Sequence, residues 1–203
     1  MAFLRSALPE DYLDAIRGQS LVLRPPAVAD YEAWAELRAL SRAHLTPWEP
    51  AWARDDLSRQ MYRRRLRVYA KDVRDDMGYA FFISDIATDT LFGGITLSNV
   101  RRGSAQSASI GYWIGKPHAG QGRMKQAVRT LLPFAFKSLR LHRLEAACMP
   151  ANVPSINVLE TSGFRREGLA RGYLKINGAW EDHILFGALA EDCGIAASAG
   201  AQA

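Results

Sequence analysis

Hydrophobic and polar residues follow two different periods along the chain, which separate strands from helices. Alternating or short apolar runs indicate strands, and apolar residues three or four apart indicate helices. Strands are predicted at residues 20–24, 79–86, 91–100, 105–115, 142–149, 164–174 and 183–189. Helices are predicted at residues 30–41, 56–73, 123–139 and 154–161. This mixture predicts an α/β (α+β) domain with an antiparallel meander at its centre.

Residues with turn or breaker chemistry place the ends of several elements. We expect Asp55 or Asp56 to cap the second helix, and Pro133 to disturb the last turns of the third. Asn177 and Gly178 lie between two apolar runs and predict the hairpin turn of the last two strands.

Length and composition favour one globular domain. With 203 residues, 48% of them hydrophobic, the chain can bury a substantial core. We assign residues 1–19 to an N-terminal extension, 20–190 to the domain and 191–203 to a disordered tail. Cys148 and Cys193 have neither metal-ligand nor disulfide spacing. With no apolar run that could span a membrane, we expect a cytoplasmic protein that does not contact membranes.

The net charge of +5 comes mainly from arginine, and arginines are densest on the second predicted helix. The cluster consists of Arg63, Arg64, Arg65 and Arg67. Such a cluster is either a solvated helix face or a surface that approaches a polyanion such as RNA. We expect no sequence-specific recognition of nucleic acid.

Two glycines between a strand and a helix form a candidate anion site at residues 119–124. Successive backbone N–H groups there can surround a phosphate at the positive end of the following helix. The segment lacks the spacing and the hydroxyl residue of a Walker A loop. It also lacks the third glycine and the opening βαβ unit of a dinucleotide fingerprint.

Two segments resemble the GNAT superfamily of N-acetyltransferases. Residues 119–124 resemble its pyrophosphate loop, Q/R-x-x-G-x-G/A, with Gly122 on the required glycine and with departures at Ala119 and Met124. Residues 152–164, NVPSINVLETSGF, resemble the N-x-x-S-x-x-V-L-E-x-x-G-F segment of one branch. That branch contains the ribosomal-protein N-terminal acetyltransferases of the RimJ and RimL type, and the resemblance extends in order over residues 21–189.

The resemblance implies a fold and a reaction. The fold is a mixed, mostly antiparallel sheet of six or seven strands, splayed between the fourth and fifth strands and flanked by about four helices. The reaction is direct attack of an amine on acetyl-CoA, the cosubstrate, in a ternary complex. We expect no metal, and the oligomeric state, monomer or homodimer, stays open.

By this resemblance, acetyl-CoA is held from three places in the chain. The strand contributes backbone groups near Trp113 and Ile114, and the short helix after residue 151 contributes Asn152 and Ser155. The loop contributes Ala119, Gly120, Gln121, Gly122, Arg123 and Met124. The side chains of Tyr112 and Trp113 also fit ordinary packing in a pleated sheet.

Three residues are candidates for proton transfer. Ser155 can donate a proton to the leaving sulfur, or it can cap the helix that follows. Glu167 is the candidate general base, or else a surface carboxylate paired with a neighbouring arginine. Tyr173 is a second candidate acid, or a structural strand tyrosine.

The acceptor is expected to be an amine that is already partly neutral, because the strand at 105–115 contains no acidic residue. A protein α-amine, with a pKa of about 7.7, is roughly a third neutral near pH 7.4, and a lysine amine, near 10.4, only about 0.1% neutral. We therefore expect a protein N-terminus as the acceptor. The resemblance implies a ribosomal protein with an N-terminal alanine.

Trp48 and Trp52, in a Trp- and Pro-rich connector between the first two helices, and Tyr112 are the candidate acceptor contacts. The two tryptophans also fit a role in covering a sheet edge. Two other functions stay open at this point. One is acetylation of a small-molecule amine such as a polyamine, an aminoglycoside or an amino acid analogue, and the other is CoA binding without turnover.

Overall fold

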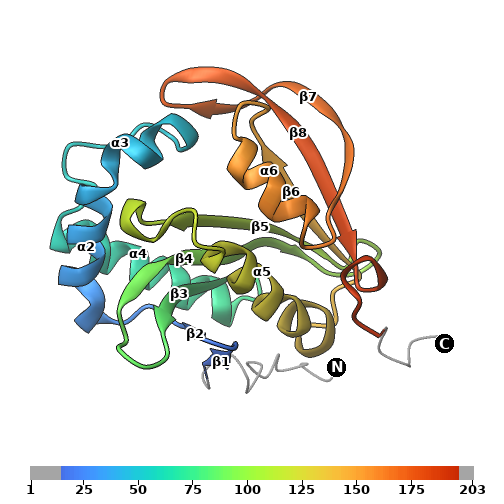
Figure 1. The fold of residues 1–203 in the computed structure, drawn as a ribbon, viewed down its shortest axis with the longest axis horizontal. Coiled ribbons are helices and arrows are strands. Elements are labelled where there is room, and N and C mark those ends of the chain that lie inside the picture. Colours follow the sequence, from blue (N-terminus) through green and yellow to red (C-terminus); the bar gives the residue numbers. More distant parts are fainter. Residues whose placement is uncertain (1–14, 197–203) are drawn as a thin grey trace, which may run out of the picture.

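The centre of the molecule is an eight-stranded sheet with the strand order β1-β2-β3-β4-β5-β6-β8-β7, in a computed structural model that describes residues 15–196 (Figure 1). The strands are β1 (Ile16–Arg17), β2 (Leu21–Arg24), β3 (Tyr79–Asp85), β4 (Leu91–Arg101), β5 (Ser107–Ile114), β6 (Arg143–Cys148), β7 (Arg165–Ile176) and β8 (Ala179–Leu189). All seven predicted strands are confirmed. The additional strand, β1, is only two residues long, too short for an alternating pattern, and it pairs with β2.

The sheet opens between β5 and β6, its only parallel neighbours. These strands pair only over Ser107–Ser109 and Arg143–Glu145, although β5 continues to Ile114 and β6 continues, paired with β8, to Cys148. Beyond the three pairs, the two halves of the sheet diverge into a V (Figure 1). The expected splay between the fourth and fifth predicted strands is therefore confirmed.

Helices cover both faces of the sheet. They are α2 (Tyr31–Leu40), α3 (Arg42–Leu45), α4 (Arg59–Arg74), α5 (Arg123–Pro133) and α6 (Val153–Glu160). Successive side chains of β3 point to opposite faces, as the strand period requires. Phe81 packs in the core that contains α5 and α6, whereas Phe82 packs with Trp34 of α2 and Tyr62 of α4.

The structure corrects two expectations about helix caps. The N-cap of α4 is Ser58, whose Oγ accepts a hydrogen bond from the Met61 amide at 3.2 Å, and not Asp55 or Asp56. The N-cap of α6 is Asn152, whose Oδ1 accepts from the Ser155 amide at 3.2 Å, so Ser155 is not the cap.

Two other local expectations are confirmed. Helix α5 ends at Pro133 and continues as a short π-helical segment, Phe134–Ser138, because proline cannot extend the regular ladder. The β7–β8 hairpin turns at Asn177 and Gly178, whose φ values of 44° and 91° are those that a two-residue hairpin turn needs.

The described chain continues past residue 190 with a 3-10 turn, Glu191–Cys193, and Ile195 packs against the core. Residues 1–14 and 197–203, which belong to the proposed extension and tail, lie outside the described part of the chain. None of the helices between residues 15 and 196 has both the length and the apolar content of a membrane span.

Candidate active site

The loop between β5 and α5 forms a cradle of backbone amides. Gly120 and Gly122 both adopt a left-handed conformation with φ of 73°, and Gly122 is the N-cap residue of α5. Glycine takes this conformation without the steric cost that other residues meet. The following amides of α5 have no partner within the helix and carry its positive end, so the loop can bind an anion.

The side chains of this loop turn away from the cradle. Nη1 of Arg123 lies 2.7 Å from Nδ1 of His118, and its guanidinium lies 3.9 Å from the centre of the Phe92 ring. Met124 is buried in the core, and Nε2 of Gln121 donates to the carbonyl of Pro117 at 2.9 Å. The loop therefore offers its main chain, which explains how Ala119 and Met124 can depart from the family pattern.

His118 is held in its neutral form beside the cradle. Because the arginine donates, Nδ1 of His118 must accept, which requires an unprotonated nitrogen. Burial and the charge of Arg123 both lower the pKa of His118. The histidine thus keeps Arg123 against Phe92 without adding a second charge.

A pair of hydroxyl groups bridges the opening of the sheet. The phenol oxygen of Tyr112, on β5, lies 2.9 Å from the Oγ of Ser155, on α6. The same phenol lies 3.3 Å from the Ser155 carbonyl oxygen. The pair therefore joins the two arms of the V at the point where β5 and β6 no longer pair. Burial raises the pKa of Tyr112, so the phenol stays protonated at neutral pH.

Trp113 and Ile114 follow Tyr112 but face other parts of the molecule. The Trp113 side chain packs with the α2 and α4 layer, on the opposite face of the sheet from Tyr112. It fits there because residue 94 is glycine, since a Cβ at Gly94 would lie 2.6 Å from the indole nitrogen. Ile114 is partly buried against the main core. These two residues can hold a ligand in the opening through their main chain.

Cys148 lies beside the hydroxyl pair, a position that sequence reasoning missed. Its Sγ is 3.7 Å from the carbonyl oxygen of Asn152, and burial raises the pKa of its thiol. The signal in the sequence was its place at the end of a predicted strand, just before the Asn-x-x-Ser segment. Cys148, Asn152, Ser155 and Tyr112 therefore form one cluster at the mouth of β6.

Glu167 and Tyr173 lie apart from this cluster. The Glu167 carboxylate accepts from Nη1 of Arg143 at 2.7 Å and also from Nη2, which lowers the pKa of Glu167. It lies at the level of Gly187, which pairs with Glu145. Three further residues of β6, or about 10 Å, separate Glu145 from Cys148. Tyr173 is 47% exposed, and its ring lies 5.8 Å from that of His183.

The connector, residues 46–58, begins with a 3-10 turn, Thr46–Trp48, and contains both candidate tryptophans. Trp48 and Trp52 are half-buried. The indole N–H of Trp52 donates to the Glu49 carboxylate at 2.8 Å, and the same carboxylate accepts two hydrogen bonds from Arg38. Trp113 joins this group, because the Arg38 guanidinium lies 4.9 Å from its ring.

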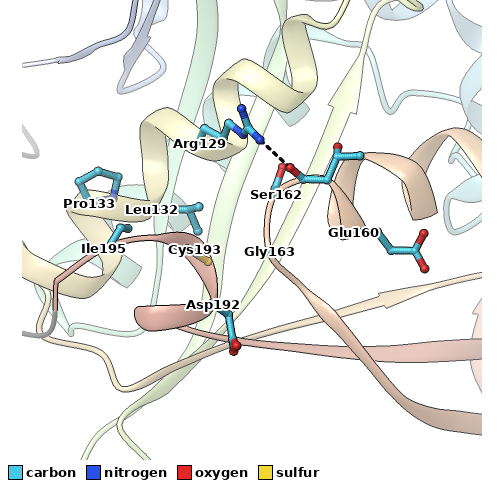
Figure 2. A pocket seen from close by; sticks show the side chains of 10 residues that line it. Arg129, Leu132, Pro133, Glu160, Ser162, Gly163, Asp192, Cys193 and Ile195 are labelled. Atoms are coloured by element: carbon cyan, nitrogen blue, oxygen red, sulfur yellow. Dashed lines mark hydrogen bonds between the residues drawn. The ribbon is translucent and has the colours of Figure 1, made fainter.

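Two hollows lie along α5. A cavity of about 490 Å³ lies between α5, the C-terminal end of α6 and Cys193 (Figure 2). Arg129 donates to the Thr161 carbonyl there at 2.7 Å, and Ser155 is not among the lining residues. A groove of about 630 Å³ borders the amide cradle at Gly122 and includes Arg17 and Lys125. The second hollow is the one that continues the cradle.

A sheet opened beside an amide cradle, with protonated hydroxyl groups in the opening, defines an enzyme that can hold a long phosphate-containing ligand and protonate its leaving group. Comparison with known proteins places this class more closely. The family profile of the acetyltransferase (GNAT) domain matches residues 20–165. The chain therefore belongs to the GNAT family of N-acetyltransferases, as its two motifs implied.

Three relatives illustrate the position within the family. The chain is 38% identical, over 87% of its length and 98% of the relative's, to a Bacillus subtilis protein named "Probable N-acetyltransferase YjcK". It is 33% identical, over 89% and 92%, to the [Ribosomal protein uS5]-alanine N-acetyltransferase of Escherichia coli. The structure of Mycobacterium smegmatis RimJ in complex with CoA-disulfide superposes with a TM-score of 0.80, at 34% identity, over 85% of this chain and 83% of that one.

Proposed function

We propose that this protein transfers the acetyl group of acetyl-CoA to the α-amino group of a protein N-terminus, with a ribosomal protein that begins with alanine as the acceptor. The observation that carries the proposal is the Tyr112–Ser155 hydroxyl pair at the opening of the sheet, on a strand without any acidic residue. Such a site can protonate a leaving group but offers no strand carboxylate to deprotonate lysine. The relatives that modify ribosomal-protein alanine support the same acceptor class.

The cosubstrate fits two features of the chain. The amide cradle at 119–124 matches a pyrophosphate, and the adjoining groove with Arg17, Lys125 and Arg129 matches the remaining anionic end of CoA. The unpaired edge of β5 after Ser109 can hydrogen-bond an amide-containing arm that lies in the opening. The RimJ structure in complex with CoA-disulfide supports this ligand.

The residues of the cluster have distinct roles in the proposed reaction. The amine nitrogen forms a bond to the thioester carbonyl carbon, the carbon–sulfur bond breaks, and the sulfur takes a proton. Ser155 donates this proton, and Tyr112 replaces it through the 2.9 Å hydrogen bond. Asn152 orients Ser155 by capping α6. Water accepts the proton that the amine releases.

A peptide panel tests the proposal. Purified protein, acetyl-CoA and a peptide with a free N-terminal alanine and one internal lysine should give a single acetyl group on the N-terminus, measured by intact mass and fragmentation. The matched control is the same peptide with a blocked N-terminus, which should stay unmodified. Faster acetylation of the lysine would contradict the proposal.

Two further outcomes would favour the other functions. Transfer to a polyamine or an aminoglycoside, without transfer to any peptide, would favour a small-molecule acceptor. Binding of CoA without transfer to any acceptor would favour a binding module.

A further inference from the structure

The connector is held by one glutamate that makes contacts in three directions. Oε1 of Glu49 accepts from Nη1 of Arg38 at 2.8 Å, and Oε2 accepts from Nη2 of Arg38 at 2.7 Å. Oε2 also accepts from the Trp52 indole at 2.8 Å. Arg38 belongs to α2, so these bonds fasten the middle of the connector to the helix that packs on the sheet.

Arg38 is itself enclosed between aromatic rings. Its guanidinium lies 4.2 Å from the Trp52 ring and 4.9 Å from the Trp113 ring, and the residue is only 7% exposed. A planar guanidinium can stack on rings while it grips a carboxylate with two parallel bonds, which a lysine cannot do. Since Trp113 follows Tyr112 on β5, this stack extends from the strand of the hydroxyl pair to the connector.

The main chain of Glu49 joins the connector to the far end of the molecule. The amide of Asn177, in the β7–β8 hairpin turn, donates to the Glu49 carbonyl oxygen at 2.9 Å. Figure 1 shows the end of α3 and the hairpin tip approaching each other across the open side of the V. The two halves of the sheet, which separate between β5 and β6, therefore meet again at Glu49 and Asn177.

The connector side of this contact is fixed to the site strand at a second place. The Ser41 hydroxyl, at the junction of α2 and α3, accepts from the Lys116 amide at 2.9 Å, two residues after β5 ends. Leu37 packs so closely on Gly115 that a Cβ there would lie 2.4 Å from its Cδ1. Movement of α2 or α3 would therefore displace the end of β5.

We propose that the connector and the Asn177–Gly178 turn form a closed arch over the acceptor entrance, and that Arg38 and Glu49 are the positioning pair that holds the arch. This inference rests on the proposed function and deepens it. A chain end can pass beneath an arch that is tied at both sides. An internal lysine cannot follow it, because its main chain continues in both directions and stays outside. The arch thus selects an extended, unstructured N-terminus.

Substitution of the positioning pair tests this role. Glu49→Gln and Arg38→Lys should each raise the KM for the alanine peptide by about tenfold or more, because displacement of a positioning element is costly. The KM for acetyl-CoA should stay within about twofold of wild type. Both variants should also lower the preference for the N-terminus over internal lysine, which a purely structural role would not change.

Asp30→Asn is the matched control. Arg24 and Asp30 form an equally close two-bond pair, at 2.8 Å and 2.8 Å, next to the start of α2, but they do not touch the connector. The control should lose some stability and keep the wild-type peptide KM. An equal rise in peptide KM for Asp30→Asn and Glu49→Gln would overturn the positioning role.

The hairpin side provides a second test on an exposed turn, where folding is not at risk. Asn177→Gly keeps the amide and tolerates the positive φ, so its peptide KM should match wild type. Asn177→Val disfavours that φ, displaces the amide and should raise the peptide KM as Glu49→Gln does. Hydrogen exchange at residue 177 should be slow in wild type and in Asn177→Gly, and fast in Glu49→Gln and Arg38→Lys.

The arch and the proposed function can fail separately. If wild-type protein does not acetylate the peptide N-terminus, the proposed function fails, and with it the selective role of the arch. If it does, and fast exchange at residue 177 leaves peptide KM and N-terminal preference unchanged, only the arch is overturned. Fast exchange at residue 177 in the wild type would overturn the arch without any reference to activity.

Discussion

At the scale of single residues, the hydroxyl pair determines what chemistry the site can perform. Tyr112 and Ser155 come from different elements and meet only where the sheet opens. Neither is close to a carboxylate in a printed contact of the described chain, and Glu167, the expected base, is engaged by Arg143. Proton donation is therefore the role that the geometry favours for the pair.

We expect Ser155→Ala to lower kcat by about 100-fold, because a positioned general acid contributes at least this much. Tyr112→Phe should have a smaller effect, and the double variant should be no slower than Ser155→Ala, since the two hydroxyl groups act in series. Steady-state and single-turnover kinetics with the alanine peptide measure these rates. Tyr173→Phe is the control and should keep wild-type kcat. Full turnover in Ser155→Ala would remove the serine from the mechanism.

The dependence of kcat/KM on pH should show one ascending limb. The acceptor reacts as the neutral amine, so the rate rises as pH passes the peptide α-amine pKa of about 7.7. The pKa of Tyr112 is raised above its ordinary value of 10.0 by burial, so the phenol remains a donor over the same range. A plateau from about pH 8.7 to 10 should follow. A descending limb below pH 10 would mean that another acid with a lower pKa donates the proton.

At the scale of elements, the sequence predicted the features that depend on local chemistry. The strands and the hairpin turn follow from alternating residues and from Asn177–Gly178, and the amide cradle follows from its glycines. The cap of α4 was misassigned because Asp55, Asp56 and Ser58 are all competent, and only the geometry of the first turn selects Ser58. Likewise, no pattern could show that Arg143 occupies Glu167, because they lie on different strands.

The cradle itself gives a prediction at this scale. Gly122→Ala places a side chain at a φ of 73°, where an L-residue costs about 1–2 kcal/mol, although no atom lies within 4 Å of the new Cβ. The strain should shift the amides of α5, lower the unfolding free energy by about that amount and raise the KM for acetyl-CoA. Gly168→Ala is the control, because it also has open space but no positive φ. Urea unfolding and acetyl-CoA titration measure both effects, and an unchanged KM would show that the cradle does not bind the cosubstrate.

At the scale of the whole molecule, the fold consists of two half-sheets with few direct bonds between them. Only three residue pairs join β5 to β6, and the contacts at Tyr112–Ser155 and Glu49–Asn177 span the rest of the opening. The sequence motifs implied this opening through the family resemblance. They could not show what spans it, since each contact joins residues that are distant along the chain. A ligand in the opening therefore acts as a further link between the halves.

This architecture predicts that CoA stabilises the protein strongly and in a defined place. A ligand at 100 times its Kd adds about 2.7 kcal/mol to the unfolding free energy. For a chain of this size, that corresponds to a rise in Tm of about 5–11 °C. Amide exchange should slow at 110–114 and 146–148, the segments of β5 and β6 that do not pair with each other. Pantetheine, which lacks the pyrophosphate, is the control ligand and should raise Tm much less at equal concentration, because it leaves the cradle unfilled. Equal shifts for the two ligands would mean that the opening, and not the amide cradle at the start of α5, supplies the binding energy.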